Sequence, residues 1–277
     1  MSNEPALRRE SGAALTERIA ALLEPLGGRT AVAAQRFGPP PPASAASEVS
    51  ITIRADEVFP AASLAKLPIA VELMRRADLG QFDLRERFDT SAQPRVGGAG
   101  VLDILDPTTE FTLAELYALM LVVSDNTAAN FVLDLVGVGE VNETLSRLNL
   151  KRTKLARHFM DAAARASGRD NVTSAGDMLT LIGLIRGNAL PGGRRLRETL
   201  AAQQSFSELT EGYLPVGATL AHKDGTLDGL VHDAGIVSGS GGIAMYCILT
   251  AEQADVPAAR AAIGQTLRLL WDTWGLG

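Results

Sequence analysis

A serine and a lysine three residues apart are the first residues in this sequence whose types and spacing suit catalysis. Ser63 and Lys66 lie in the run Ser-Leu-Ala-Lys, and residues at this spacing share one face of a helix. A serine hydroxyl becomes a good nucleophile when a base removes its proton, and a neutral lysine amine can be that base. Burial and a second cation nearby would favour the neutral amine. The pair therefore indicates nucleophilic catalysis, although a Ser-x-x-Lys run also arises by chance.

Two further polar motifs follow along the chain. Ser124-Asp125-Asn126 falls between two apolar stretches that predict helices. All three residue types also favour helix caps, so a simple helix connection is the alternative interpretation. Lys223-Asp224-Gly225-Thr226 follows a predicted strand, where glycine lets a substrate approach the strand edge and form main-chain hydrogen bonds. Because the chain has four lysines in all, finding lysine in two such motifs is informative.

Strands at both ends of the chain and helices in the middle would position these motifs. The periodicity predicts helices over 12–25 and 256–274, and strands over 30–37, 49–54, 218–223, 230–237 and 243–250. The proline tract 38–42 predicts a stiff loop between the first two strands, which we interpret as a hairpin. Thr112 with Glu115, and Ser174 with Asp177, are helix-capping signatures within the middle region.

We therefore predict an α+β fold built from two domains. Residues 1–61 plus 205–277 would form a discontinuous α/β domain with five strands and two terminal helices. Residues 62–204 would form an all-α domain inserted into it. The cleft between the two domains is the expected place for the active site.

Composition excludes several kinds of partner. A net charge of −6 and a pI near 5.2 give no general attraction to nucleic acid or to an anionic membrane. We expect no metal and no cofactor, because no residues lie at zinc-ligand spacing.

The single cysteine, Cys247, lies in an apolar run and is expected to be buried. Charges at Glu17 and Arg18 interrupt the first apolar segment, so we expect no signal peptide, and a cytoplasmic monomer.

In their order, the three motifs resemble the S-x-x-K, S-D-N and K-T-G set of class A β-lactamases and penicillin-recognising serine hydrolases. The run Ser124–Asn130, Ser-Asp-Asn-Thr-Ala-Ala-Asn, is especially close, and the resemblance covers nearly the whole chain. It implies a five-stranded antiparallel sheet with the terminal helices packed on it. It also implies acyl transfer from a small lactam, amide or ester to the serine and then to water, with hydrolysis of a lactam amide bond as the leading interpretation.

The resemblance also assigns a role to each matched residue. Ser63 would attack the carbonyl, and Lys66 would act as base, directly or through water. Ser124 and Lys223 would pass a proton to the leaving nitrogen. The substrate-binding residues would be Asn126, which holds a substrate carbonyl, together with Asp224, Gly225 and Thr226. The backbone N–H groups of Ser63 and Thr226 would form the oxyanion hole.

The chain departs from this family between residues 150 and 173. Class A β-lactamases have a glutamate there that activates the deacylating water, whereas this stretch has no glutamate. Asp170 is expected to pair with an arginine such as Arg157. That leaves Asp161 as the candidate to orient water, although Phe159 or a neighbour can instead occupy the glutamate position.

A second departure is Asp224, where the family has a threonine or serine that helps bind the carboxylate of penicillins and cephalosporins. An aspartate there would weaken the field of Lys223 and repel a substrate carboxylate. We expect poor affinity for common β-lactams unless the Asp224 side chain turns away from the cleft. His232 and Asp233, just downstream, are predicted to form a hydrogen-bonded pair near the cleft.

Two alternatives to the β-lactamase interpretation stay open. An esterase, amidase or D-alanyl peptidase could use the same serine, and Asp224 gives a physical reason for a substrate without a carboxylate. The missing glutamate favours the other alternative, a binding or sensor module that is acylated with little turnover.

Overall fold

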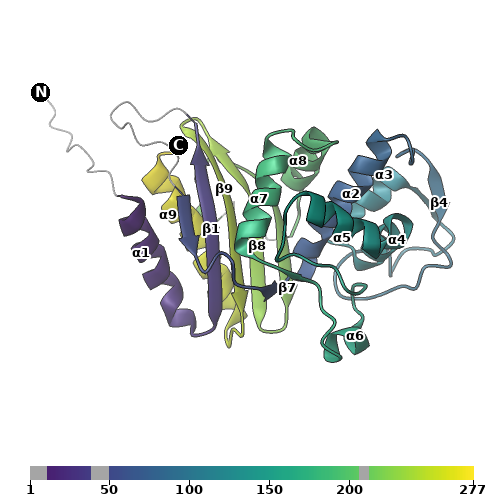
Figure 1. The fold of residues 1–277 in the computed structure, drawn as a ribbon, viewed down its shortest axis with the longest axis horizontal. Helices are drawn as coiled ribbons and strands as arrows, with labels where there is room; N and C mark the ends of the chain where they lie inside the picture. The colour runs from purple at the N-terminus through teal and green to yellow at the C-terminus, as the bar shows by residue number, and fades with distance from the viewer. Residues whose placement is uncertain (1–10, 39–49, 206–211) are drawn as a thin grey trace, which may run out of the picture.

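The computed structural model describes residues 11–38, 50–205 and 212–277 (Figure 1). Gly38 is the last residue described before the predicted hairpin loop, and the prolines 39–42 lie outside the described residues. Among the described residues, no helix combines the length and the apolar character needed to span a bilayer.

A five-stranded antiparallel sheet forms the centre of one half of the molecule. Its strand order is β2-β1-β9-β8-β7, so the first and last parts of the chain lie side by side. The register pairs Arg29 with Ala251 and Phe37 with Ile243. The strands are β1 (Arg29–Phe37), β2 (Ser50–Ile53), β7 (Thr219–Leu227), β8 (Leu230–Gly239) and β9 (Gly242–Ala251). The predicted fold class is confirmed.

The terminal helices cover one face of this sheet (Figure 1). α1 (Gly12–Leu23) begins at the N-cap Ser11, and a short 3-10 turn, η1 (Glu24–Leu26), follows it. α9 (Val256–Trp274) begins at the N-cap Asp255 and carries Trp271 and Trp274, which are both buried against the sheet. Alternate residues of the strands fill the core between the helices and this face.

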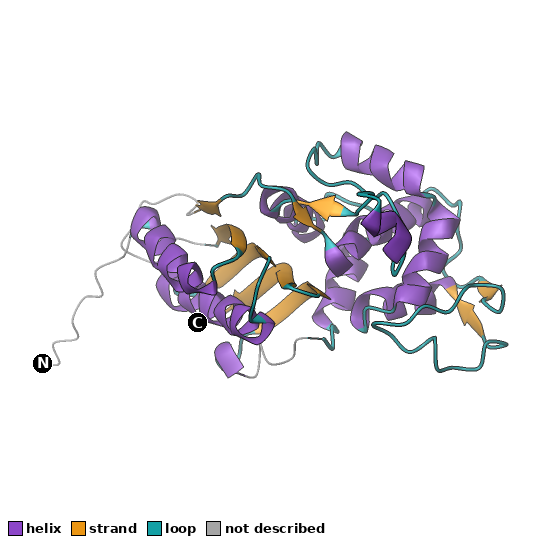
Figure 2. Ribbon diagram, turned by 90° about the horizontal axis from the view of Figure 1, so that it is seen from below, coloured by secondary structure: helices purple, strands orange, loops and turns teal. Residues whose placement is uncertain are grey.

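The other face packs against the helical region between β3 and β7. Figure 2 shows these helices gathered at the end of the molecule away from α1 and α9. They are η2 (Ala62–Ala65), α2 (Lys66–Asp78), α3 (Leu113–Val122), α4 (Asn126–Val136), α5 (Val138–Arg147), α6 (Ala162–Ala166), α7 (Ala175–Arg186) and α8 (Gly193–Ala201). Two short strand pairs accompany them, β3 (Phe59–Pro60) with β6 (Val172–Thr173) and β4 (Arg87–Asp89) with β5 (Glu110–Thr112). The exact domain boundaries stay a prediction.

Both predicted capping signatures begin helices. Thr112 and Glu115 form a reciprocal capping box at the start of α3, and Ser174 accepts a hydrogen bond from the Asp177 backbone N–H at the start of α7.

The predicted end of the strand at 223 is wrong, because β7 continues to Leu227. Gly225 is part of the strand rather than a break in it. The third motif therefore lies within a strand at the edge of the sheet.

Candidate active site

The nucleophile candidate lies where a tight turn enters a helix. Ser63 is half-buried within η2, and α2 begins directly after this 3-10 turn, at Lys66. The preceding residue, Ala62, has a φ of 46°, a left-handed conformation that is unusual for a residue with a side chain. Such strain persists where the surrounding structure imposes it, and it recurs at functional sites.

Lys66 connects the first two motifs. Its Nζ lies 3.2 Å from Ser63 Oγ, 3.0 Å from Ser124 Oγ, 2.6 Å from the Ser124 carbonyl oxygen and 2.8 Å from Asn126 Oδ1. The side chain is fully buried. The predicted one-turn spacing thus places the lysine amine beside the Ser63 hydroxyl, and the turn before α4 brings the Ser124 hydroxyl to the same amine.

Burial lowers the pKa of Lys66 well below its usual value, and the positive charge of Lys223 lowers it further. The neutral amine has two N–H donors and one lone pair. The Ser124 carbonyl oxygen and Asn126 Oδ1 can only accept, so they occupy the two donors. The lone pair is then free to accept a hydrogen bond from a serine hydroxyl, as a general base must.

Phe159 covers the same amine. Its ring centroid lies 4.7 Å from Lys66 Nζ. Asn130 holds its backbone, because Asn130 Oδ1 accepts from the Phe159 N–H at 2.7 Å and Asn130 Nδ2 donates to the Phe159 carbonyl oxygen at 3.1 Å. An aromatic ring thus occupies the space beside the base, as the sequence had allowed. Its apolar surface adds to the desolvation of Lys66.

The second motif turns sharply between α3 and α4. Ser124 has a φ of 56°, which directs its carbonyl and its hydroxyl to Lys66. Asp125 caps α4 by accepting from the Ala128 N–H at 2.8 Å, so the cap interpretation of this residue is also correct. Asn126 donates to the Gly97 carbonyl oxygen at 3.0 Å, which fixes its amide with Oδ1 toward the lysine.

The edge strand β7 brings the third motif against Ser63. A Cβ atom placed on Gly225 would lie 3.1 Å from the Ser63 backbone nitrogen and 3.1 Å from Ala62 Cβ. A side chain at this position would therefore require the strand or the turn at Ser63 to shift by a few tenths of an ångström. The close approach places the Gly225 backbone near the Ser63 N–H.

Asp224 does not turn away from the neighbouring lysine. Lys223 Nζ donates to Asp224 Oδ1 at 2.7 Å and to the Asp224 carbonyl oxygen at 3.1 Å, and the lysine is fully buried. Burial raises the pKa of the Asp224 carboxyl, but the charge and hydrogen bond of Lys223 outweigh this effect and leave the pKa below its usual value. The Asp224 carboxyl is therefore ionised near neutral pH, and it forms an ion pair with the Lys223 amine.

Gln203 completes this pair and was missed by the sequence analysis. It follows α8, and its Nε2 donates to Asp224 Oδ1 at 2.7 Å. The next residue, Gln204, anchors the segment by donating its backbone N–H to the Val122 carbonyl oxygen near the end of α3. No local pattern indicated this residue, because only the packing of α8 against β7 brings it to the site.

The structure separates the two carboxylates that follow Leu150. Asp170 pairs with Arg157 at 2.7 Å, as predicted. Asp161 is the N-cap of α6, and its Oδ1 accepts from the Ala164 N–H at 2.8 Å. Within residues 11–38, 50–205 and 212–277, no carboxylate is hydrogen-bonded to Ser63 or Lys66.

The predicted pair of His232 and Asp233 is wrong. Neighbouring residues on a strand point to opposite faces of the sheet, so these two cannot meet. Asp233 instead accepts from His222 Nδ1 at 2.8 Å and from the Tyr246 hydroxyl at 2.8 Å. His232 contacts the Pro60 carbonyl oxygen through Nε2 at 2.8 Å, and its Nδ1 accepts from the Thr250 N–H.

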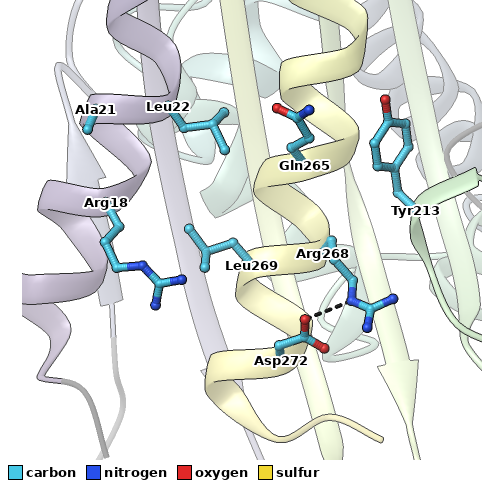
Figure 3. A pocket seen from close by; sticks show the side chains of 8 residues that line it. All are labelled: Arg18, Ala21, Leu22, Tyr213, Gln265, Arg268, Leu269 and Asp272. Carbon is cyan, nitrogen blue, oxygen red and sulfur yellow. Dashed lines mark hydrogen bonds and ion pairs between the residues drawn. The ribbon is translucent and has the colours of Figure 1, made fainter.

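Elsewhere on the molecule a shallow pocket of about 400 Å³ opens between α1 and α9 (Figure 3). It lies on the face of the sheet that the terminal helices cover, and it contains no residue of the three motifs. Its lining includes the ion pair of Arg268 with Asp272 at 2.7 Å. In the described part of the chain, no cluster of three or more His, Cys, Asp or Glu side chains could hold a metal ion.

Known proteins share this sequence pattern and this fold. A family model described as "Beta-lactamase enzyme family" matches residues 14–274. A β-lactamase of Citrobacter koseri is 27% identical over 255 residues, which are 85% of this chain and 80% of the relative. The structure of β-lactamase from Sphaerobacter thermophilus DSM 20745 superposes with a TM-score of 0.85 at 26% identity, over 97% of this chain and 99% of the other. PBP-A superposes with a TM-score of 0.83 at 27% identity, over 96% and 98%, and a PBP-A variant has been solved as an acyl-enzyme complex with penicillin G.

Proposed function

The chain belongs to the beta-lactamase enzyme family, and from that premise we propose that its reaction is hydrolysis of a lactam through an acyl-enzyme on Ser63. The observation that carries this assignment is the buried amine of Lys66 at 3.2 Å from Ser63 Oγ. With its donors occupied by two acceptors, this amine has a lone pair available for the serine proton.

In the acylation step, Ser63 Oγ forms a bond to the lactam carbonyl carbon, and its proton passes to Lys66 Nζ. The carbon–nitrogen bond of the lactam then breaks. The proton reaches the leaving nitrogen through Ser124 Oγ, which lies 3.0 Å from the lysine amine. The backbone N–H groups of Ser63 and Thr226 stabilise the negative oxygen of the tetrahedral intermediate.

Lys223 and Asn126 support this proposed acylation step. The charge of Lys223 lowers the pKa of Lys66 and so favours the free base; its predicted part in proton transfer stays a prediction. Asn126 keeps one amide hydrogen that the Gly97 carbonyl oxygen does not use, which suits a substrate carbonyl.

In the deacylation step, a water oxygen bonds to the acyl carbon, the ester bond to Ser63 breaks, and a proton returns to the serine. Phe159 favours a slow step here, because its ring occupies the space beside Lys66. The water-activating role predicted for Asp161 has no comparable support, since its Oδ1 caps α6. A slowly released acyl-enzyme is therefore the second candidate function, one in which the protein acts as an acylated binding or sensor module.

Intact-protein mass spectrometry after mixing with a reactive cephalosporin separates these two functions. An adduct that forms and decays with product release identifies a working β-lactamase, and a persistent adduct identifies the binding function. Ser63→Ala is the control. This substitution should lower the rate of adduct formation by more than about 10⁴-fold and leave the fold intact. An adduct that survives in this variant contradicts the assignment of the nucleophile.

A further inference from the structure

The end of the site beside Lys223 differs in charge from the rest. Lys223 and Asp224 form a buried ion pair with an Nζ–Oδ1 distance of 2.7 Å. A lone lysine at this place would attract a carboxylate. Here the aspartate already pairs with that lysine, so an incoming carboxylate would meet the like charge of Asp224.

Gln203 gives this end a second acceptor. Its Nε2 donates to Asp224 Oδ1, which fixes the amide and identifies the other end as the carbonyl oxygen Oε1. That oxygen is buried and has no hydrogen-bond partner within the described residues. A buried acceptor without a donor is unfavourable, and a ligand that brings a donor relieves this.

The position of this acceptor ties it to the reaction centre. The Gln203 amide shares Asp224 Oδ1 with Lys223 Nζ. Asp224 is in turn close enough to Lys66 for its charge to act on the amine. A substrate with its carbonyl at Ser63 would therefore extend along β7 toward an ion pair and an amide oxygen that lacks a donor.

We infer that the acyl substrate carries an uncharged N–H donor, such as an amide, at the end facing Asp224 and Gln203, where penicillins and cephalosporins carry a carboxylate. This inference rests on the proposed function, because it describes the substrate of the same serine. It assigns Gln203 and Asp224 as specificity residues for that substrate.

A matched pair of substrates tests the inference. One is a chromogenic cephalosporin with its ring carboxylate, and the other is the same compound with a primary amide in that position. The measured quantity is the second-order rate constant for acylation of Ser63 at neutral pH. Its amide-to-carboxylate ratio is compared between variants, so the intrinsic reactivities of the two compounds cancel.

Asp224→Asn keeps the size of the side chain and an oxygen for Lys223, but it removes the negative charge. The amide-to-carboxylate ratio should fall about tenfold to a hundredfold in this variant, mainly because the carboxylate compound reacts faster. An unchanged ratio would overturn the inference.

Gln203→Leu supplies an independent variant in case Asp224→Asn does not fold. It should slow acylation by the amide compound about threefold to tenfold and leave the carboxylate compound nearly unchanged. The matched control is Gln204→Leu, whose side chain is exposed and which should alter neither rate. Equal losses with both compounds in Gln203→Leu would show that Gln203 has a purely structural role.

Different outcomes contradict the substrate specificity and the proposed function. If the wild-type protein is acylated by both compounds and prefers the carboxylate as strongly as Asp224→Asn does, the specificity inference is wrong and the proposed function stands. If neither compound modifies Ser63, the proposed function is wrong and the inference fails with it.

Discussion

Two sets of buried polar side chains lie close together in this protein, and only one of them is suited to catalysis. We call them the serine site, formed by Ser63, Lys66, Ser124, Asn126, Lys223 and Asp224, and the sheet cluster, formed by His222, Asp233 and Tyr246 on one face of the sheet and His232 on the other. Both contain fully buried titratable groups with shifted pKa values. Burial raises the pKa of Asp233, whereas it lowers the pKa of Lys66.

The difference lies in what each network leaves unused. In the sheet cluster, the Asp233 carboxylate accepts hydrogen bonds from His222 and Tyr246, and both ring nitrogens of His232 are hydrogen-bonded to backbone atoms. In the serine site, the proposed base Lys66 retains a lone pair, and the proposed nucleophile Ser63 is half-buried. Perturbed pKa values alone therefore do not identify a catalytic centre; an available lone pair and access to a reactive atom do.

The largest expected effect is at the base of the serine site. Lys66→Ala should slow acylation about 10²- to 10⁴-fold, which corresponds to about 3–5 kcal/mol of activation free energy. Lys66→Arg should be similarly slow, because a guanidinium stays protonated and cannot accept the serine proton. Stopped-flow acylation with a cephalosporin measures both.

The pH profile of the wild-type protein sharpens the same test. Acylation needs neutral Lys66, so its rate should fall as the pH drops through the lowered pKa of this amine. A Lys66→Ala variant that reacts within tenfold of wild type, with the same pH profile, would place the base elsewhere.

The next effect concerns the stability that the sheet cluster provides. Burial lowers the pKa of His232 to about 4, from 6.5 for the free side chain. Between these values the unfolded chain binds the proton and the folded chain does not. The free energy of unfolding should therefore lose about 3 kcal/mol through His232 as the pH falls from 6.5 to 4.

Urea unfolding at several pH values measures this loss. His232→Gln, which has no titrating group, should show a pH dependence weaker by that amount. Equal slopes for the variant and the wild type would mean that His232 takes up its proton in the folded state near its ordinary pKa.

The smallest expected effect distinguishes the two networks most cleanly. Tyr246→Phe removes the hydroxyl that donates to Asp233, so the free energy of unfolding should fall by about 2 kcal/mol. The acylation rate should stay within twofold of wild type. A tenfold slower acylation in a folded variant would couple the sheet cluster to the serine site and break the comparison.

The helix bounds and the contacts that depend on nearby residues were predicted correctly from the sequence. The bounds of α9 match the predicted 256–274, because its apolar periodicity and its acidic N-cap are both local. Ser63 and Lys66 meet because one helical turn separates them. Asp170 and Arg157 were paired correctly because both lie in one short loop.

The errors concern contacts that depend on register or on packing between distant elements. Strand alternation could have excluded the pair of His232 with Asp233, but only the register of β7 on β8 identifies His222 as the partner. Gln203 reaches Asp224 because α8 ends beside β7, and nothing near residue 203 encodes this. The covering of Lys66 by Phe159 likewise depends on how the loop before α6 folds back onto α4.

The order of the strands has a consequence for how the protein is made. Arg29 of β1 pairs with Ala251 of β9, so the central strand pair joins the earliest and the latest parts of the chain. A ribosome adds about 5–20 residues per second, so β1 waits roughly 10 to 40 s for its neighbour β9, whereas its other neighbour β2 follows at once. The helical region has more local contacts and can fold during this interval. The sheet then closes last, and until β9 emerges one edge of the apolar β1 has no strand to pair with.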